Sequence, residues 1–344
     1  MENIQNNTII YNLECSPSYI INNLSQSKDS LYYIHNSQSF PRVLVINKKI
    51  IKQNNNIINN NKSMAVLNSS EKNEMLFVKS ILIKDVEYIA IGLYNGFKLW
   101  NKDGTRLLHQ ISNPNNNNKN KIYAFICCAE FVLDKNNSYK LCADSIISGD
   151  NYGNLFLIFG SKSNWKNVKI FSSHNSEGIL SIGTHKEIND FGISLNNGDI
   201  IIMKIVKGNC ELIKKFEENG KKLIALNSVV FSKEDKSEFF LGSGFINGEI
   251  RIYSLKEYNW KYSIHSNLRS IGPMIVKNNC EIIVGSDDGQ INIWKYDDKK
   301  DQIILKNNLL FEDKMIVGLS YDDEDNVLYF NSYDYPEIIC ISNI

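Results

Sequence analysis

The fold follows from one stretch of the sequence, Ile282-Ile-Val-Gly285-Ser-Asp-Asp288-Gly289-Gln-Ile-Asn-Ile-Trp294. Apolar residues run up to the turn and alternate with polar ones after it, which is the pattern of two strands joined by a tight turn. Nearly the same frame occurs at Ile89-Ala-Ile-Gly92-Leu-Tyr-Asn95-Gly96-Phe-Lys-Leu-Trp100. A frame that returns along the chain indicates a repeat fold.

Three further copies of the frame lie at 146–159, 191–203 and 240–253. The turn glycines of the five copies are separated by 57, 45, 50 and 41 residues, close to the length of a four-stranded propeller blade. Asn-Gly or Asp-Gly at most of these turns predicts two-residue type I′ hairpins, because both residues tolerate positive φ. The predicted structural turn residues are Gly96, Gly153, Gly198, Gly248 and Gly289.

Two degenerate copies flank these five, at 31–46 and 327–341, with Pro41 and Pro336 at the turn position. Seven turns in 344 residues give about 49 residues per blade. We therefore expect one all-β domain over 1–344, a seven-bladed β-propeller. Residues 8–13 form a surplus strand at the start, and the last blade lacks one, so the N-terminal strand is expected to close the ring.

Two asparagine-rich runs, at 53–62 and 113–120, interrupt the repeats. Such segments bury too little apolar surface to offset the entropy of ordering them. We expect both to be mobile loops that are removable without loss of the fold.

The composition narrows the class of protein. Thirty-eight basic and 38 acidic residues leave no net charge, which argues against a nucleic-acid partner. Seven irregularly spaced cysteines do not form a disulfide framework and indicate reduced thiols. No apolar stretch approaches the roughly 18 residues of a membrane helix, and residues 1–8 are polar without a basic start. We expect a soluble monomer in the cytosol or nucleus that does not bind membranes.

The Gly-x-x-x-Gly frame ending in Trp100 or Trp294 resembles the WD-repeat family of β-propellers, and the resemblance spans the whole chain. The aspartate that follows the tryptophan in that family is replaced by Asn101 and Lys295. Only His174 and His265 occupy plausible positions for the family's opening histidine. The resemblance implies a single propeller without added domains, and no catalytic activity follows from it.

The chemically reactive side chains in this sequence are interpreted as structural or solvent-exposed rather than functional. The pair Cys127-Cys128 lies in an apolar run typical of an innermost strand, with the two thiols on opposite faces, buried and inert. The acidic run 321–326 is interpreted as a short strand connection with solvated charges. The histidines lack metal-ligand spacing, no phosphate-binding loop motif occurs, and no two arginines are adjacent. Catalytic, cofactor and metal sites are therefore not expected.

Aromatic residues near the turns are the remaining candidates. They mark either a protein-binding surface or packing against the neighbouring blade. The residues are Phe40 and Tyr335, together with the four predicted interaction residues Tyr94, Tyr152, Phe245 and Tyr333.

The sequence thus predicts a non-catalytic protein-interaction scaffold whose partners are proteins. The alternative is a propeller hydrolase or esterase with its site in the central channel. That alternative requires three or more histidines and carboxylates that converge there.

Overall fold

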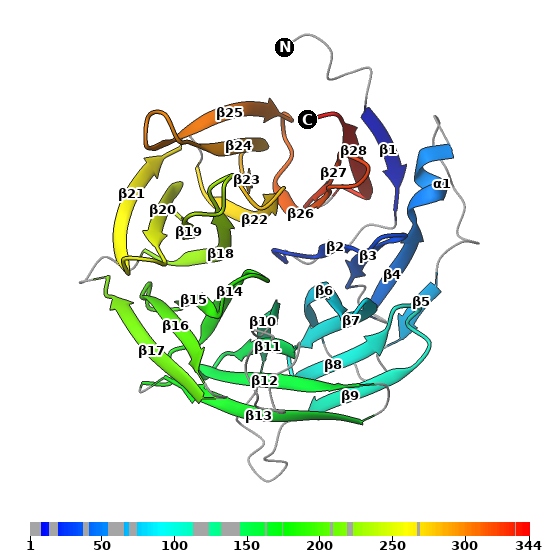
Figure 1. Ribbon diagram of the computed structural model, residues 1–344. Coiled ribbons are helices and arrows are strands. Elements are labelled where there is room, and N and C mark those ends of the chain that lie inside the picture. Colours follow the sequence, from blue (N-terminus) through cyan, green and yellow to red (C-terminus); the bar gives the residue numbers. More distant parts are fainter. Residues whose placement is uncertain are drawn as a thin grey trace.

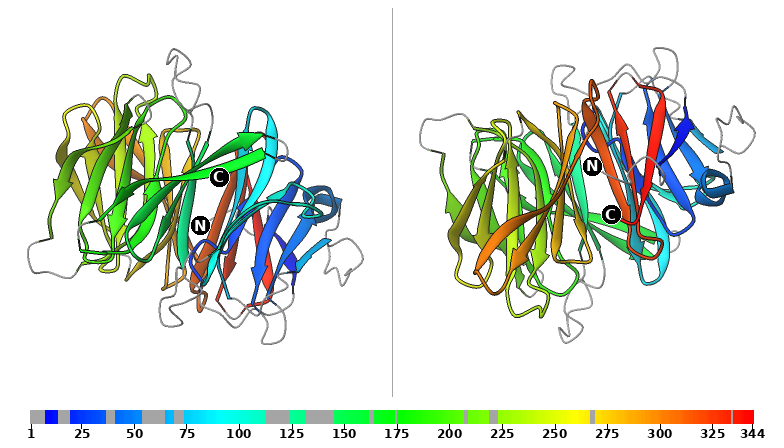
Figure 2. Two further views of the ribbon diagram at one scale, coloured as in Figure 1. Left: turned by 90° about the horizontal axis from the view of Figure 1, so that it is seen from below. Right: turned by 90° about the horizontal axis from the view of Figure 1, so that it is seen from above.

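Seven four-stranded antiparallel sheets surround a central axis in the computed structural model (Figure 1). The structure describes residues 8–13, 20–36, 41–53, 65–68, 74–112, 124–131, 145–161, 164–173, 175–206, 209–218, 223–266, 269–333 and 335–344. Seen from the sides, the sheets stand next to one another like blades, with their connecting loops at the two ends (Figure 2). The predicted all-β, seven-bladed β-propeller is confirmed. Of the asparagine-rich run at 53–62, the structure describes only Gln53, which ends a short helix. The rest of that run, the run at 113–120, Phe40 and His174 lie outside the described residues.

The strands of each blade run outward from the axis in chain order, except that the outermost strand of the last blade is the first strand of the chain. The innermost strands are β2 (Leu24–Gln26), β6 (Met75–Ile83), β10 (Phe125–Phe131), β14 (Ile179–Gly183), β18 (Ala225–Ser232), β22 (Ile271–Lys277) and β26 (Ile316–Asp322). The second strands are β3 (Ser30–His35), β7 (Val86–Leu93), β11 (Ser145–Asp150), β15 (Asp190–Leu195), β19 (Phe239–Phe245), β23 (Glu281–Ser286) and β27 (Val327–Ser332).

The third strands are β4 (Arg42–Asn47), β8 (Gly96–Asn101), β12 (Asn154–Ser161), β16 (Ile200–Val206), β20 (Glu249–Ser254), β24 (Gln290–Asp297) and β28 (Glu337–Ser342). The outermost strands are β5 (Ala65–Asn68), β9 (Leu107–Ser112), β13 (Asn164–Ser172), β17 (Asn209–Phe216), β21 (Asn259–His265), β25 (Gln302–Leu310) and β1 (Thr8–Asn12). One short helix, α1 (Lys48–Gln53), lies between β4 and β5. We number the blades 1 to 7 by their innermost strands, from β2 to β26.

The first strand closes the ring, as the sequence predicts. Strand β1 pairs antiparallel with β28 from Thr8 opposite Ile341 to Asn12 opposite Glu337. Tyr11 is almost fully buried there and packs with Ile51 of α1. The outermost strand of blade 7 therefore comes from the opposite end of the chain.

A buried ion pair joins the same two blades. Lys48, the first residue of α1 in blade 1, donates from Nζ to the Asp322 carboxylate at the end of β26, 2.7 Å away. Both side chains are buried. The acidic run does connect β26 to β27, but the expectation that all its charges are solvated is wrong for Asp322. A lysine 274 residues away in sequence draws that carboxylate inward.

Close packing of blades explains the first glycine of the repeated frame. Gly285 lies on β23 against the innermost strand of blade 7, and a Cβ there would be only 2.6 Å from Cγ2 of Ile316. A side chain would therefore push the two blades apart.

The turns themselves differ from the predicted type I′ hairpins. The five turn glycines have positive φ, but none of the residues before them does. In blades 3 to 6 the glycine N–H donates to the carbonyl three residues earlier, as at Gly289 and Ser286. This is a type I turn followed by a left-handed glycine, the usual three-residue hairpin loop. Since the residue before the glycine keeps an ordinary φ, Tyr152 is accommodated as easily as asparagine.

Candidate functional site

One end of the propeller carries all the recurring turns, and we call it the turn face. The loops between second and third strands meet there with the segments that enter the innermost strands. In six blades the loop residue after the second strand donates its N–H to the carbonyl of the residue that precedes the innermost strand. The donors and acceptors are Tyr94 and Glu74 (3.0 Å), Asn151 and Ala124 (2.9 Å), Asn196 and Gly178 (2.9 Å), Ile246 and Ile224 (3.0 Å), Asp287 and Ser270 (3.3 Å), and Tyr333 and Met315 (2.8 Å).

The structure separates the four predicted interaction residues. Tyr94 is 46% exposed at the edge of blade 2, and Tyr152 and Tyr333 are half-buried on the same face. Phe245 has no exposed surface. The turn face therefore presents three of the four rings to solvent to different degrees, and Phe245 cannot contact a partner.

A shift of one residue explains the error at Phe245. It lies three residues before its turn glycine, where every one of the five clear copies has a buried residue, whereas Tyr94 lies two residues before. The residue in blade 5 that matches Tyr94 is Ile246, which is 38% exposed and which the sequence analysis missed. The buried position is occupied by Leu93, Asp150, Leu195, Phe245 and Ser286.

Phe245 belongs to the core between blades 4 and 5. It packs with Ile200 and Ala225, and the Arg251 guanidinium lies over its ring, 4.5 Å from the centroid. Carboxylates of Glu249 and Glu218 hold that guanidinium in place.

The substitution Phe245→Ala should therefore lower the free energy of unfolding by about 3–5 kcal/mol, because it leaves a cavity in a packed core. Chemical denaturation measures this loss. The neighbouring Ile246→Ala is the control, and its effect should stay within about 0.5 kcal/mol, as for most surface substitutions. Equal effects of the two substitutions would contradict the assignment of Phe245 to the core.

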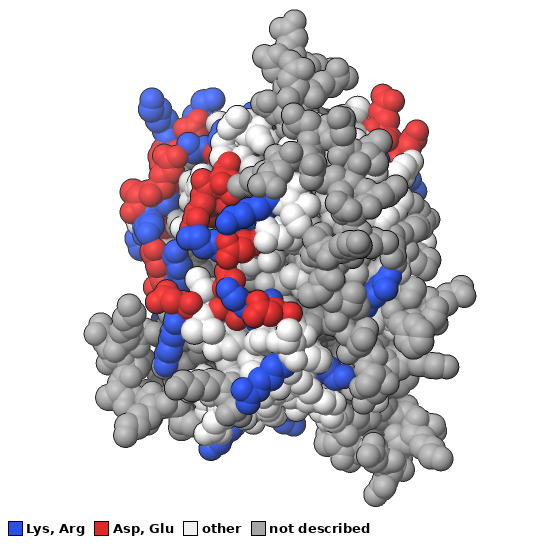
Figure 3. Space-filling view, turned by 90° about the vertical axis from the view of Figure 1, so that its right-hand side faces the viewer, with Lys and Arg blue, Asp and Glu red and all other residues white. Residues whose placement is uncertain are grey.

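Tyr335 adds a further exposed ring in blade 7, at 40% exposure. The Lys314 ammonium lies 3.8 Å from the centroid of this ring and also pairs with the Glu337 carboxylate. The ring is thus held in place rather than swinging freely. On the side of the molecule shown in Figure 3, positive and negative side chains are interspersed.

The adjacent cysteines Cys127 and Cys128 are not suited to act as nucleophiles. Cys127 packs between blades 3 and 4, and Cys128 packs between blades 2 and 3, so the two thiols lie on opposite faces of β10 as predicted. Burial raises the pKa of Cys128 to about 12 and raises that of Cys127 well above its ordinary value. Both thiols are therefore protonated near neutral pH.

The central channel was the place where a hydrolytic site would have to assemble. Of the described histidines and carboxylates, His185 and Asp323 are the two that line it. Burial lowers the pKa of His185, and its Nδ1 accepts from the Glu187 N–H at 3.2 Å. Fewer than three such groups converge, so the channel does not favour the hydrolase alternative.

Two searches for other kinds of site concern only the described part of the chain. Within it, no three histidine, cysteine or carboxylate side chains are grouped so as to hold a metal ion. Nor does it contain a helix long and apolar enough to cross a membrane.

No protein-family model and no curated protein sequence matches this chain. Its fold, by contrast, recurs in 1672 chains of solved structures. One is a chain in the crystal structure of a mitotic checkpoint complex, with a TM-score of 0.71 and 11% sequence identity over 97% of this chain and 90% of that chain. At this identity the likeness shows the fold alone. The chain is therefore a seven-bladed β-propeller.

Proposed function

We propose that this propeller is a non-catalytic scaffold that binds a protein partner on its turn face. The observation that carries the proposal is the set of exposed apolar and aromatic side chains at that end: Tyr94, Ile246 and Tyr335 come from blades 2, 5 and 7. Aromatic side chains of this kind supply large contact area at low entropic cost.

The rigidity of the loops supports this assignment. Each of the six loops is tied by a backbone hydrogen bond to the start of an innermost strand, at 2.8–3.3 Å. Loops held in this way lose little conformational entropy when a partner binds, and binding residues on a rigid scaffold are a common arrangement. Tyr152 and Tyr333 extend the same surface with partly covered rings.

Among propellers, we propose the WD-repeat type, on the frames that end in Trp100 and Trp294. Within that family the order of segments is most similar to WD-repeat-containing protein 54. Three stretches suggest this similarity: 97–104, 284–295 and 333–338.

The proposed setting is the cytosol or nucleus, with the protein as a monomer that binds neither nucleic acid nor membranes. The zero net charge supports the first exclusion, and the odd number of irregularly spaced cysteines supports a reducing compartment.

Alanine substitutions on the turn face test the proposal. Tyr94→Ala and Ile246→Ala should each weaken partner capture by at least about 1 kcal/mol, because both remove exposed contact area from the proposed surface. Affinity capture from the native organism, with quantitative mass spectrometry, measures the loss. Melting temperatures of the same variants should hardly change.

The matched control is Leu305→Ala. Leu305 is as exposed as Tyr94 but lies on the outermost strand β25, away from the turn face. It should leave capture unchanged. If Tyr94→Ala and Ile246→Ala also retain full capture, the turn face is not the binding surface.

A further inference from the structure

The channel along the axis of the ring is a polar cavity of about 510 Å³. All seven innermost strands line it. Each of these strands is the last in its sheet, so its inner edge has no neighbouring strand. Backbone N–H and C=O groups of those edges therefore have no strand partner, and some bond to side chains instead, as the Ser80 N–H does to Ser25 Oγ at 2.8 Å. The volume lies within the range typical of small-molecule sites.

Two hydrogen-bonded side chains cross one end of this cavity. Asn22, just before β2, accepts a hydrogen bond at 3.0 Å from Nδ2 of Asn227 on β18. These residues belong to blades 1 and 5, which are not neighbours in the ring. The Asn22 N–H also donates to the Val317 carbonyl of blade 7 at 2.9 Å. In Figure 1 the segment that enters β2 reaches toward the centre of the ring. The channel is thus narrowed at the turn face.

A single lysine lies along the wall. Lys79 is in the middle of β6, in the sequence Phe77-Val-Lys-Ser-Ile81. Its side chain is exposed and lines the cavity. Within the described chain it forms no ion pair. An ammonium group inside a walled cavity is less screened than one on an open surface, so it attracts an anion more strongly.

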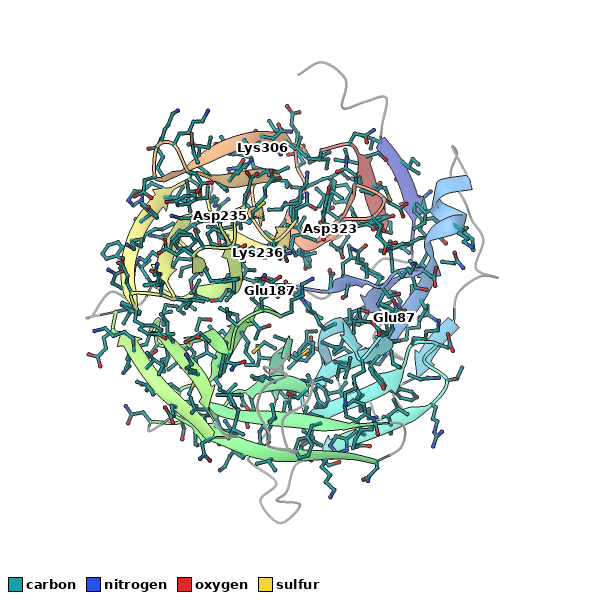
Figure 4. The ribbon with its side chains drawn as sticks, in the orientation of Figure 1. Glu87, Glu187, Asp235, Lys236, Lys306 and Asp323 are labelled. Carbon is teal, nitrogen blue, oxygen red and sulfur yellow. The ribbon has the colours of Figure 1, made fainter. Side chains whose placement is uncertain are left out.

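The other end of the cavity is ringed by charges that have partners. Figure 4 shows Glu187, Lys236 and Asp323 around the central opening. Glu187 pairs with Lys236 at 2.5 Å, and Asp323 accepts from the Asn278 N–H at 2.9 Å. The charged residues that line the cavity itself are two lysines, Lys79 and Lys186, and one aspartate, Asp323. The cavity is therefore net positive by one charge.

We propose that the channel binds a compact organic anion that also carries hydroxyl groups, entering from the end that Glu187 and Lys236 surround. The phosphate or carboxylate of the ligand pairs with Lys79. Its hydroxyls bond to backbone groups of the inner strand edges and to hydroxyl side chains such as Ser80 and Ser320, which also line the cavity. This site is separate from the turn face, and neither depends on the other.

Isothermal titration calorimetry with three sugars of similar size tests the proposal. Glucose 6-phosphate and gluconate distinguish a phosphate from a carboxylate ligand, and glucose lacks the charge. At least one anion should bind with a stoichiometry of one, and glucose should not. Because the Lys79 pair is charge-assisted, Lys79→Met should weaken that binding by at least about 10-fold, whereas Lys79→Arg should retain it.

Lys214→Met is the control, since Lys214 is an exposed lysine on the outermost strand β17. It should bind like the unmodified protein. Circular dichroism of every variant establishes that the fold is intact, and Lys79→Arg keeps the test decisive if Lys79→Met is unstable. Two outcomes would overturn the proposal: neither anion binds at millimolar concentration, or Lys79→Met binds as tightly as Lys214→Met.

Discussion

Deletion of residues 1–13 is expected to destabilise the whole ring rather than one edge of it. The deletion removes β1, whose five residues pair with β28, and it takes away the buried ring of Tyr11. Loss of the Tyr11 side chain alone costs about 3–5 kcal/mol. Loss of the hydrogen bonds between β1 and β28 adds to this cost. This is a large share of the roughly 5–15 kcal/mol that stabilises a typical domain. Thermal and chemical denaturation measure the loss.

Removal of residues 1–7 alone is the matched control, since these precede the first paired residue, Thr8. That shorter deletion should leave the melting temperature unchanged. The longer one should also promote self-association, because β28 would become an unprotected sheet edge. A protein lacking residues 1–13 that melts like the control would show that β1 does not close the ring.

Local chemistry explains why the fold was predictable. Each of the five glycine turns has positive φ at its glycine, and glycine at a fixed distance from apolar strands marks these turns, as at Gly248 and Gly289. The closing strand followed from counting strands at both ends. The type of turn was not predictable in this way, because Asn-Gly and Asp-Gly serve both the two-residue and the three-residue loop.

The sites were harder to predict because exposure depends on register. Phe245 and Ile246 are adjacent, yet one is in the core and the other is in solvent. Comparing both with Tyr94 at the same distance from the turn glycine would have identified Ile246. Lys79 carried a signal too, since it is a lone charge inside an apolar innermost strand. No local pattern pairs Lys48 with Asp322, which only the closed ring brings together.

Removing one partner of the buried pair Lys48 and Asp322 should strongly destabilise the fold. Lys48→Met or Asp322→Asn should each cost about 3–5 kcal/mol, because the remaining charge or polar group stays buried without its partner. Replacing both with Met and Leu should recover most of that loss, since an apolar pair removes both desolvation penalties. The free energies of unfolding of the three variants measure the coupling. The control is the exposed pair Lys28 and Glu324, which spans the same two blades and should contribute less than about 1 kcal/mol.

The pair should also make stability depend on pH in one direction. Burial alone would raise the pKa of Asp322, but the hydrogen bond and charge of Lys48, with the N–H groups of Asp325 and Glu324, hold it below its ordinary value. A carboxyl whose pKa is lower in the folded state stabilises the fold above its unfolded pKa, and that contribution disappears as the pH falls through the folded pKa. The difference in stability between the unmodified protein and Asp322→Asn should therefore be full at neutral pH and shrink below about pH 4. Denaturant titrations at several pH values measure it. A difference that stays constant down to pH 2 would mean that the pKa of Asp322 is the same in the folded and unfolded states. The ion pair with Lys48 would then not be the cause of the difference in stability.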